Sequence, residues 1–255
     1  MRVVRFARGG QTGRVTAEEQ AAVAARVPGA AALGLLAPPA APAVPAALFA
    51  DAGWTADRLA ALGARYASDD RRVLATVWWY SASSVLLTPA LAGLATGLPL
   101  SARLADTSVA LLGGGTPIAA TSSAPGTDTA AELRESLSAV VDAVAAAGRV
   151  RTRPLWAIAT DSLANRLLAI GRAVGDVAAA TALAGPLAAA VGAPLPAPRY
   201  VDVAGTRFTR RASCCLLYRL PHEAVCTSCP RRDPVQRAVL LADEAERTGS
   251  DVPLR

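Results

Sequence analysis

All four cysteines of this chain lie in one short stretch near its C-terminal end. Their order is Cys214 and Cys215, ten intervening residues, Cys226, two residues and Cys229. Disulfide-rich scaffolds are short secreted chains with cysteines spread along their length, whereas residues 1–213 contain none. The arrangement therefore favours a metal or redox site over disulfide bonding.

Two kinds of metal site compete for four thiolates at this spacing. A structural zinc site usually pairs its cysteines across tight turns, and only Cys226-Thr-Ser-Cys229 has that form. Neighbouring side chains of an extended backbone point to opposite faces, so Cys214 and Cys215 suit one small ion only if the backbone leaves the strand conformation. An iron–sulfur cluster is larger, takes four thiolates, and often has a proline after Cys-x2-Cys, as Pro230 is here.

The pattern Cys-Cys-x10-Cys-x2-Cys near the C-terminus of a chain of this size resembles the FhuF family of ferric siderophore reductases. The aromatic residues 78–80, a hairpin in the middle of the chain and the helix entry at 154–156 extend the resemblance more weakly. The resemblance implies a single 2Fe–2S cluster. Its implied ligands are Cys214, Cys215, Cys226 and Cys229.

The same resemblance implies an oxidoreductase of iron uptake. Such an enzyme transfers one electron through its cluster to the Fe(III) of a siderophore, and Fe(II) is released because oxygen donors bind it far more weakly. An acidic electron donor, such as a ferredoxin or a flavin reductase, is the implied partner. Two other functions stay open, namely an iron–sulfur redox sensor that signals by cluster loss and a zinc-bound structural or nucleic-acid module.

The basic residues exclude several kinds of chemistry. All 26 are arginine, so no lysine can form a Schiff base or bind phosphate in a P-loop. His222 is the one histidine, which excludes serine–histidine triads and histidine metal clusters. His222 lies between the two cysteine pairs, but four cysteines already complete a cluster. We therefore expect His222 in a loop or an outer-shell role.

Positive charge is concentrated around the cysteines. The net charge is +6, and residues 199–237 contain eight arginines against three acidic residues. This rim either balances the charge of a thiolate site or docks an acidic electron donor or an anionic iron chelate. Nucleic acid is not expected, because no interleaved aromatic residues or zinc-finger spacing accompany the charge. The docking candidates are Arg210, Arg211, Arg231, Arg232, Trp78 and Trp156, with Asp161 as a further residue of the cleft.

The sequence also predicts where the protein works. Residues 1–14 carry four arginines, and no long apolar stretch of the kind found in secretory signals follows them. The apolar stretches 30–50 and 85–100 are interrupted by prolines, so neither is expected to span a membrane. We therefore expect a cytoplasmic protein, in which the thiols stay reduced.

Helical periodicity dominates the chain. Aromatic residues make up only 4% and alanine is abundant, which favours helix over strand. A first helix is predicted from the capping box Thr16-x-x-Glu19, and residues 28–45 read as a proline–alanine linker. The other predicted helices are 55–67, 68–80, 129–148, 155–172, 174–184 and 234–248, with Pro186 as a break after the fifth of these.

A small amount of β structure is predicted beside the helices. Residues 108–121 contain two short apolar runs around three glycines, which indicates an antiparallel hairpin. Residues 199–203 and 206–220 read as extended, with a turn at Gly205. The fold class is therefore α+β and mostly helical. We expect a substrate-binding helical body at 1–198 and a 2Fe–2S-binding segment at 199–255, separated near the prolines of 194–198.

Overall fold

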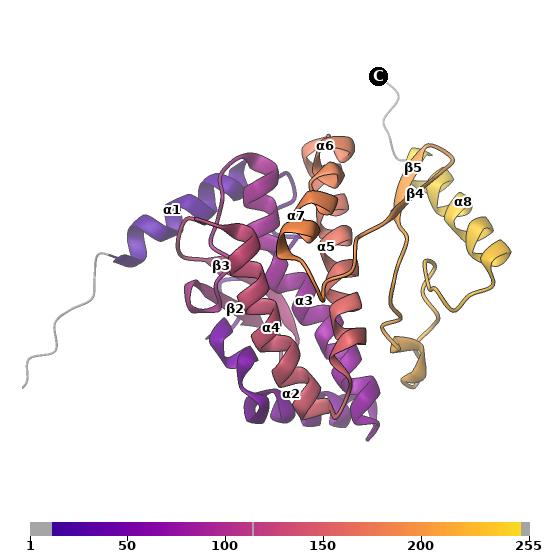
Figure 1. Cartoon of the computed structure of the whole chain (residues 1–255), viewed down its shortest axis with the longest axis horizontal. Helices are drawn as coiled ribbons and strands as arrows, with labels where there is room; N and C mark the ends of the chain where they lie inside the picture. The colour runs from indigo at the N-terminus through magenta and orange to yellow at the C-terminus, as the bar shows by residue number, and fades with distance from the viewer. Residues whose placement is uncertain (1–11, 114, 251–255) are drawn as a thin grey trace, which may run out of the picture.

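Helices form most of the computed structural model, which describes residues 12–113 and 115–250 (Figure 1). The helices are α1 (Thr12–Ala25), α2 (Ala52–Tyr66), α3 (Arg71–Thr96), α4 (Thr129–Gly148), α5 (Thr152–Val174), α6 (Val177–Ala182), α7 (Ala184–Val191) and α8 (Pro234–Ser250). The strands are β1 (Ala43–Pro45), β2 (Thr107–Leu111), β3 (Pro117–Ser122), β4 (Tyr200–Val203) and β5 (Thr206–Thr209), and short 3-10 helices are η1 (Ala46–Ala50), η2 (Leu104–Asp106) and η3 (Leu217–Arg219). The fold is α+β and mostly helical, as predicted.

The helices α3 and α5 pack side by side and run in the same direction. The indole Nε1 of Trp79 donates a hydrogen bond to the Leu155 carbonyl at 2.8 Å. Further along both helices, the buried hydroxyls of Ser83 and Ser162 lie 2.7 Å apart. Because both helices advance together between these contacts, their N-termini lie at the same end of the body.

The aromatic residues of α3 point to three different neighbours. Trp78 packs against Phe49, with ring centroids 5.2 Å apart, and Trp79 is fully buried against α5. The Tyr80 ring instead meets the guanidinium of Arg211 at 4.9 Å. A helix that is apolar on most sides is expected to be buried, and α3 joins the core of the body to the C-terminal segment.

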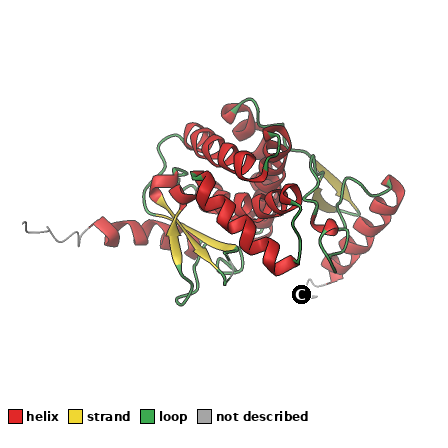
Figure 2. Ribbon diagram, turned by 90° about the horizontal axis from the view of Figure 1, so that it is seen from below, coloured by secondary structure: helices red, strands yellow, loops and turns green. Residues whose placement is uncertain are grey.

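Two small antiparallel sheets lie at opposite sides of the helices (Figure 2). The predicted hairpin is confirmed, because β2 pairs with β3, and β1 adds a third strand along β2. The second sheet is the hairpin β4–β5. Its turn residues Ala204 and Gly205 both have positive φ, as the right-handed twist of a two-residue hairpin turn requires.

Several details differ from the sequence-based expectation, and the largest is α3, which runs through Pro89 to Thr96 instead of ending at residue 80. The first helix begins at Thr12 rather than at the predicted Thr16 cap, and β1 lies inside the predicted linker. Pro186 does not break a helix, because it lies in the first turn of α7, where its missing N–H has no intrahelical partner. The predicted extended run from Thr206 ends as a strand at Thr209.

The C-terminal segment packs beside α5, with α8 as its outermost helix (Figure 1). Phe208 of β5 forms a small cluster with Leu241 and Ala245 of α8, and the hydroxyl of Tyr200 donates to the Ala164 carbonyl of α5 at 3.1 Å. The domain boundary predicted at 194–198 falls in the irregular connection before β4 and stays a prediction. Among the described residues, no helix combines the length and apolar character that crossing a membrane requires.

Candidate cysteine site

A buried carboxylate on α5 holds the backbone that leads into the first cysteine pair. Asp161 is 1% exposed and accepts hydrogen bonds from the backbone N–H groups of Ala212 at 2.7 Å and Ser213 at 2.9 Å. The Ser213 hydroxyl donates to the same carboxylate at 2.5 Å. The position of Cys214 relative to the helical body therefore depends on Asp161.

Arg211 connects the same carboxylate to the sulfur atoms. Its guanidinium lies 3.5 Å from Asp161, stacks over Tyr80 and donates from Nη1 to the Cys226 sulfur at 3.4 Å. Burial alone lowers the pKa of Arg211, but the neighbouring Tyr80, Cys215 and Asp161 raise it above the usual value. Arg211 is therefore a permanent positive charge beside the sulfurs.

Arginine side chains also brace the second cysteine pair. The Cys229 N–H donates to the Cys226 carbonyl at 3.1 Å, which closes the turn between them. Arg232 donates to the carbonyls of Val225 and Cys226, and Arg237 donates to the Cys229 carbonyl at 3.3 Å. These bonds fix the turn before any ligand is bound.

The four sulfurs form two pairs, each joining one cysteine of the first half to one of the second. The sulfurs of Cys214 and Cys229 lie 3.9 Å apart, and Cys215 and Cys226 share a hydrogen bond. All four cysteines are free. Over the described parts of the chain, no three histidine, cysteine, aspartate or glutamate side chains are grouped as for one metal ion.

The pairing favours a thiolate next to Arg211. The hydrogen bond from Cys226, together with Arg211, lowers the pKa of Cys215 to about 5. The same hydrogen bond raises the pKa of Cys226, and burial raises the pKa of Cys214. Since thiolates are the form of cysteine that binds metals, the pair of Cys215 and Cys226 beside Arg211 is suited to ligation.

The site has the chemistry that a 2Fe–2S cluster needs. Such a cluster takes four thiolates, two on each iron, and the structure supplies two sulfur pairs. Arg211 is buried, and within the described residues its Nη2 atom has no hydrogen-bond partner, whereas its Nε faces Asp161. An unsatisfied buried charged donor costs stability, and a negatively charged cluster with sulfur acceptors would satisfy it.

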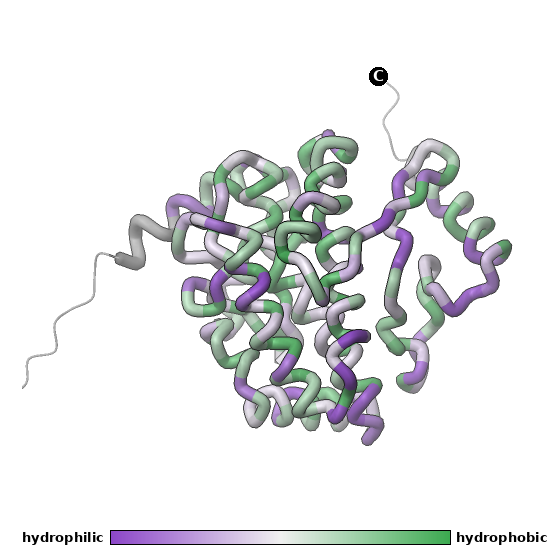
Figure 3. The backbone as a smooth tube through the Cα atoms, viewed as in Figure 1, coloured by the Kyte–Doolittle hydropathy of each residue, from purple (hydrophilic) through white to green (hydrophobic). Residues whose placement is uncertain are grey.

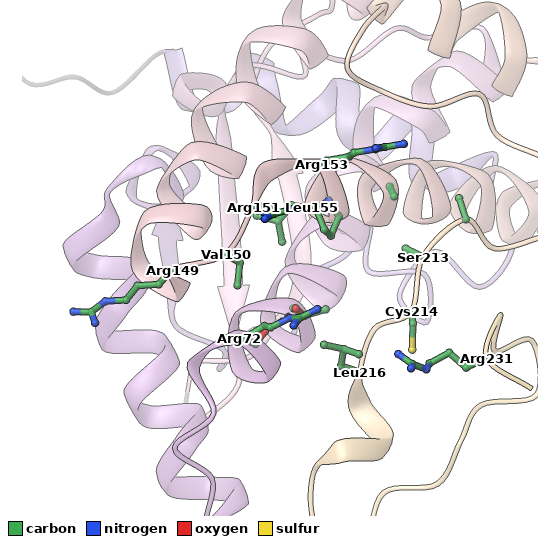
Figure 4. Close-up of a pocket in the computed structure, with 14 residues that line it drawn as sticks. Arg72, Arg149, Val150, Arg151, Arg153, Leu155, Ser213, Cys214, Leu216 and Arg231 are labelled. Atoms are coloured by element: carbon green, nitrogen blue, oxygen red, sulfur yellow. Dashed lines mark hydrogen bonds between the residues drawn. The ribbon is translucent and has the colours of Figure 1, made fainter.

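A pocket of about 720 Å³ lies beside the first cysteine pair. It is lined by the beginnings of α3 and α5, by the residues that precede α5, and by the cysteine segment. Figure 4 shows Leu216, Cys214 and Arg231 on one side of this space and Arg72 of α3 beyond Leu216. Cys214 is the one cysteine among the lining residues of this pocket.

The six predicted docking residues have different places in the structure. Arg231 is exposed and lines the pocket beside Cys214. Arg210 is also exposed, and it lines a separate pocket of about 200 Å³ with Arg199. Arg211 is buried and Arg232 bonds to backbone carbonyls, so both support the local structure instead of forming an open surface.

The two predicted docking tryptophans are in the core. Trp78 is 3% exposed and Trp156 is 4% exposed, and neither lines the pocket beside Cys214. The core position of Trp78 follows from its contacts with Phe49 and Trp54. Asp161, considered as a cleft residue, is buried beneath the cysteine segment. His222 is exposed in a turn with φ of 66°, as expected for a loop residue.

Sequence reasoning missed the pocket arginines that lie far from the cysteines in the chain. Arg72 lies in the first turn of α3, and Arg149, Arg151 and Arg153 lie close in sequence to the start of α5. One available signal was the position of Arg72, Arg151 and Arg153, because arginines are unfavourable at the positive end of a helix. Ser213 was missed as well, since nothing in the sequence links it to Asp161.

Comparison with known proteins supports the cysteine motif. Residues 211–231 match the family model described as the FhuF 2Fe-2S C-terminal domain, and all four cysteines lie in that span. No curated protein matches the chain. The family model, together with the paired thiols, supports an iron–sulfur site, and the predicted resemblance to the FhuF family is confirmed in the cysteine segment.

Proposed function

We propose that this protein is a ferric siderophore reductase, which gives one electron to the Fe(III) of a siderophore and so releases Fe(II). A 2Fe–2S cluster on Cys214, Cys215, Cys226 and Cys229 would supply the one-electron chemistry. The family match at 211–231 supports this proposal. We place the reaction in the cytoplasm, where cysteines that are free, as these are, remain reduced.

The position of Cys214 carries the proposal. Its sulfur meets Cys229 on one side, and its side chain lines the pocket of about 720 Å³ on the other. A chelate in this pocket lies beside a ligand sulfur. The electron then reaches the chelate directly from that sulfur, without crossing other parts of the protein. The other cysteines have no place in that lining, so Cys214 is the proposed exit for the electron.

The surrounding residues have separate tasks in this mechanism. Arg211 donates a hydrogen bond to Cys226, and hydrogen bonds to ligand sulfurs raise reduction potentials by stabilising negative charge. Leu155 and Leu216 line the pocket and limit water between chelate and sulfur. No residue has to accept or donate a proton, because adding one electron to Fe(III) breaks no covalent bond.

A single-turnover reaction tests the proposal. The protein is purified without oxygen, reduced with dithionite, freed of reductant and mixed with ferric hydroxamate, catecholate and carboxylate siderophores. We expect at least one siderophore to reoxidise the protein, with an equal amount of Fe(II) captured by a ferrous trapping agent. The matching gallium(III) complex is the control, because gallium(III) accepts no electron under these conditions.

Failure of this reaction would point to the other functions. If no ferric siderophore reoxidises the protein while oxygen destroys its visible absorbance, the redox-sensor function is favoured over the reductase function. If the isolated protein is colourless and contains zinc without sulfide, the zinc module replaces both.

A further inference from the structure

We propose that the pocket beside Cys214 is specific for ferric chelates of net negative charge. This inference rests on the proposed function, which by itself does not say what kind of chelate is reduced.

The pocket lining is strongly positive. Five arginines line it, and the lining contains no aspartate or glutamate. All five side chains are exposed. These arginines are Arg72, Arg149, Arg151, Arg153 and Arg231.

These five guanidinium groups have no polar partner among the described residues. In the part of the chain that the structure describes, none of their side chains forms a hydrogen bond, an ion pair or a ring contact. Other arginines do: Arg207 pairs with Asp202 at 2.8 Å, and Arg103 pairs with Glu132 at 3.5 Å. The pocket arginines are therefore available for a ligand.

Three of these arginines lie at helix N-termini, a position that works against stability, whereas Arg149 is the C-cap of α4. Positive charge at a helix N-terminus is unfavourable, yet Arg72 lies in the first turn of α3 and Arg153 in the first turn of α5. Arg151, the N-cap of α5, provides no side-chain cap, whereas four other helices have an aspartate cap at Asp51, Asp70, Asp128 and Asp176. Positive charge without a capping carboxylate is therefore found where α5 begins, whereas Asp70 caps α3 close to Arg72.

This end of the helical body faces the cysteine segment. Figure 3 shows hydrophilic residues at the lower ends of the central helices. In Figure 4 the guanidinium of Arg231 lies beside Cys214, and that of Arg149 points away from it. We therefore expect Arg72, Arg151 and Arg231 to contribute more to ligand binding than Arg149.

The size and floor of the pocket suit a chelate. Its volume of about 720 Å³ lies within the range of roughly 300–1,000 Å³ of ligand sites. Leu155, Leu216 and Val150 provide apolar contacts beneath the arginines. A tricatecholate complex, with aromatic rings and net negative charge, matches both features. A neutral trihydroxamate complex gains nothing from the arginines, and a cationic one is repelled.

Equilibrium binding of redox-inert complexes tests this inference separately from turnover. The cluster-loaded protein is titrated with a gallium(III) tricatecholate, which is anionic, and with a gallium(III) trihydroxamate, which is neutral. Binding is measured by calorimetry at two salt concentrations. We expect the tricatecholate to bind at least about ten-fold more tightly, and its advantage to shrink as salt rises.

The variant Arg72→Gln with Arg231→Gln removes two charges next to Cys214. We expect it to weaken tricatecholate binding roughly ten-fold, at about two- to five-fold per exposed charge, and to leave trihydroxamate binding unchanged. Arg219→Gln is the matched control, since Arg219 is exposed in the cysteine segment but absent from the pocket lining. Arg72→Gln also removes an unfavourable helix charge, so we expect an unchanged or higher melting temperature.

Three results would overturn the inference. Equal affinity for the two gallium complexes removes the charge preference, and equal weakening by Arg219→Gln shows a general effect of net charge. If ferric trihydroxamates are reduced while the tricatecholate fails to bind, the proposed function stands and this inference is wrong. If the tricatecholate binds as expected but no ferric chelate is reduced, the preference of the pocket for anionic chelates is supported and the proposed reductase function is wrong.

Discussion

The carboxylate of Asp161 on α5 holds Ser213, the residue before the first cysteine, through both its backbone N–H and its hydroxyl. A helix of the body thus positions a sulfur of the C-terminal segment. The same carboxylate pairs with Arg211, which donates to Cys226. One buried side chain therefore orders parts of both cysteine pairs.

Loss of the Asp161 carboxylate should uncouple the cysteine segment from α5. We expect Asp161→Ala to destabilise the protein by about 3–5 kcal/mol, because a buried charge on Arg211 loses its partner. Ser213→Ala, which removes one hydrogen bond, should cost only about 1–3 kcal/mol. Urea unfolding with iron analysis measures both effects. Full iron content in a stable Asp161→Ala variant would contradict this role.

Arg211 should raise the reduction potential of the site. We expect Arg211→Met to lower the potential by roughly 60 mV, since a hydrogen bond from a charged group contributes about 1.4 kcal/mol and that energy equals about 59 mV for one electron. Arg211→Lys keeps the charge and should recover most of the shift. Anaerobic redox titration measures the potentials, and equal shifts in the two variants would exclude a charge effect.

Electron entry should depend on exposed arginines outside the substrate pocket. Arg199 and Arg210 line the separate pocket of about 200 Å³, so we expect charge reversal at both to slow reduction by an acidic ferredoxin. The effect should be about ten-fold at low salt and should fade as the Debye length drops below roughly 8 Å. Arg219→Glu is the control. Arg232 is not used for charge reversal, because its side chain donates to the Cys226 carbonyl. If the rate of reduction by the ferredoxin changes neither with salt nor with charge reversal, these arginines do not dock the donor and only form a solvated rim.

Each cysteine should be required for a normal cluster. We expect Cys214→Ser, Cys215→Ser, Cys226→Ser and Cys229→Ser each to lower iron content and to change the visible spectrum, because four thiolates hold a 2Fe–2S cluster. Serine is close in size to cysteine, so global folding measured by circular dichroism should change little. A normal spectrum in Cys214→Ser would remove that residue from the ligand set and from its proposed role in electron transfer.

Local signals in the sequence predicted the regular elements well. Residues 129–148 form α4 with the predicted bounds, because the apolar spacing and the polar start are both local. The helix is capped by Asp128, whose carboxylate accepts a hydrogen bond from the Ala131 N–H at 3.0 Å. The strand β1 was missed because three residues, Ala43–Pro45, are too few to show periodicity, and its partner β2 is distant in the chain.

The candidate site was only partly predictable for the same reason. Spacing alone identified the four cysteines, and charge alone identified Arg231 at the pocket. The burial of Arg211 depends on Asp161, which belongs to another element and is distant in the chain. The pocket arginines come together only because α3 and α5 run in parallel, an arrangement that no local pattern encodes.

The iron and acid-labile sulfide content of protein purified without oxygen tests the central claim most directly. The two sulfur pairs, Cys214 with Cys229 and Cys215 with Cys226, match a cluster with two thiolates on each iron. We therefore predict about two irons and about two sulfides per chain. One zinc per chain without sulfide would contradict the account.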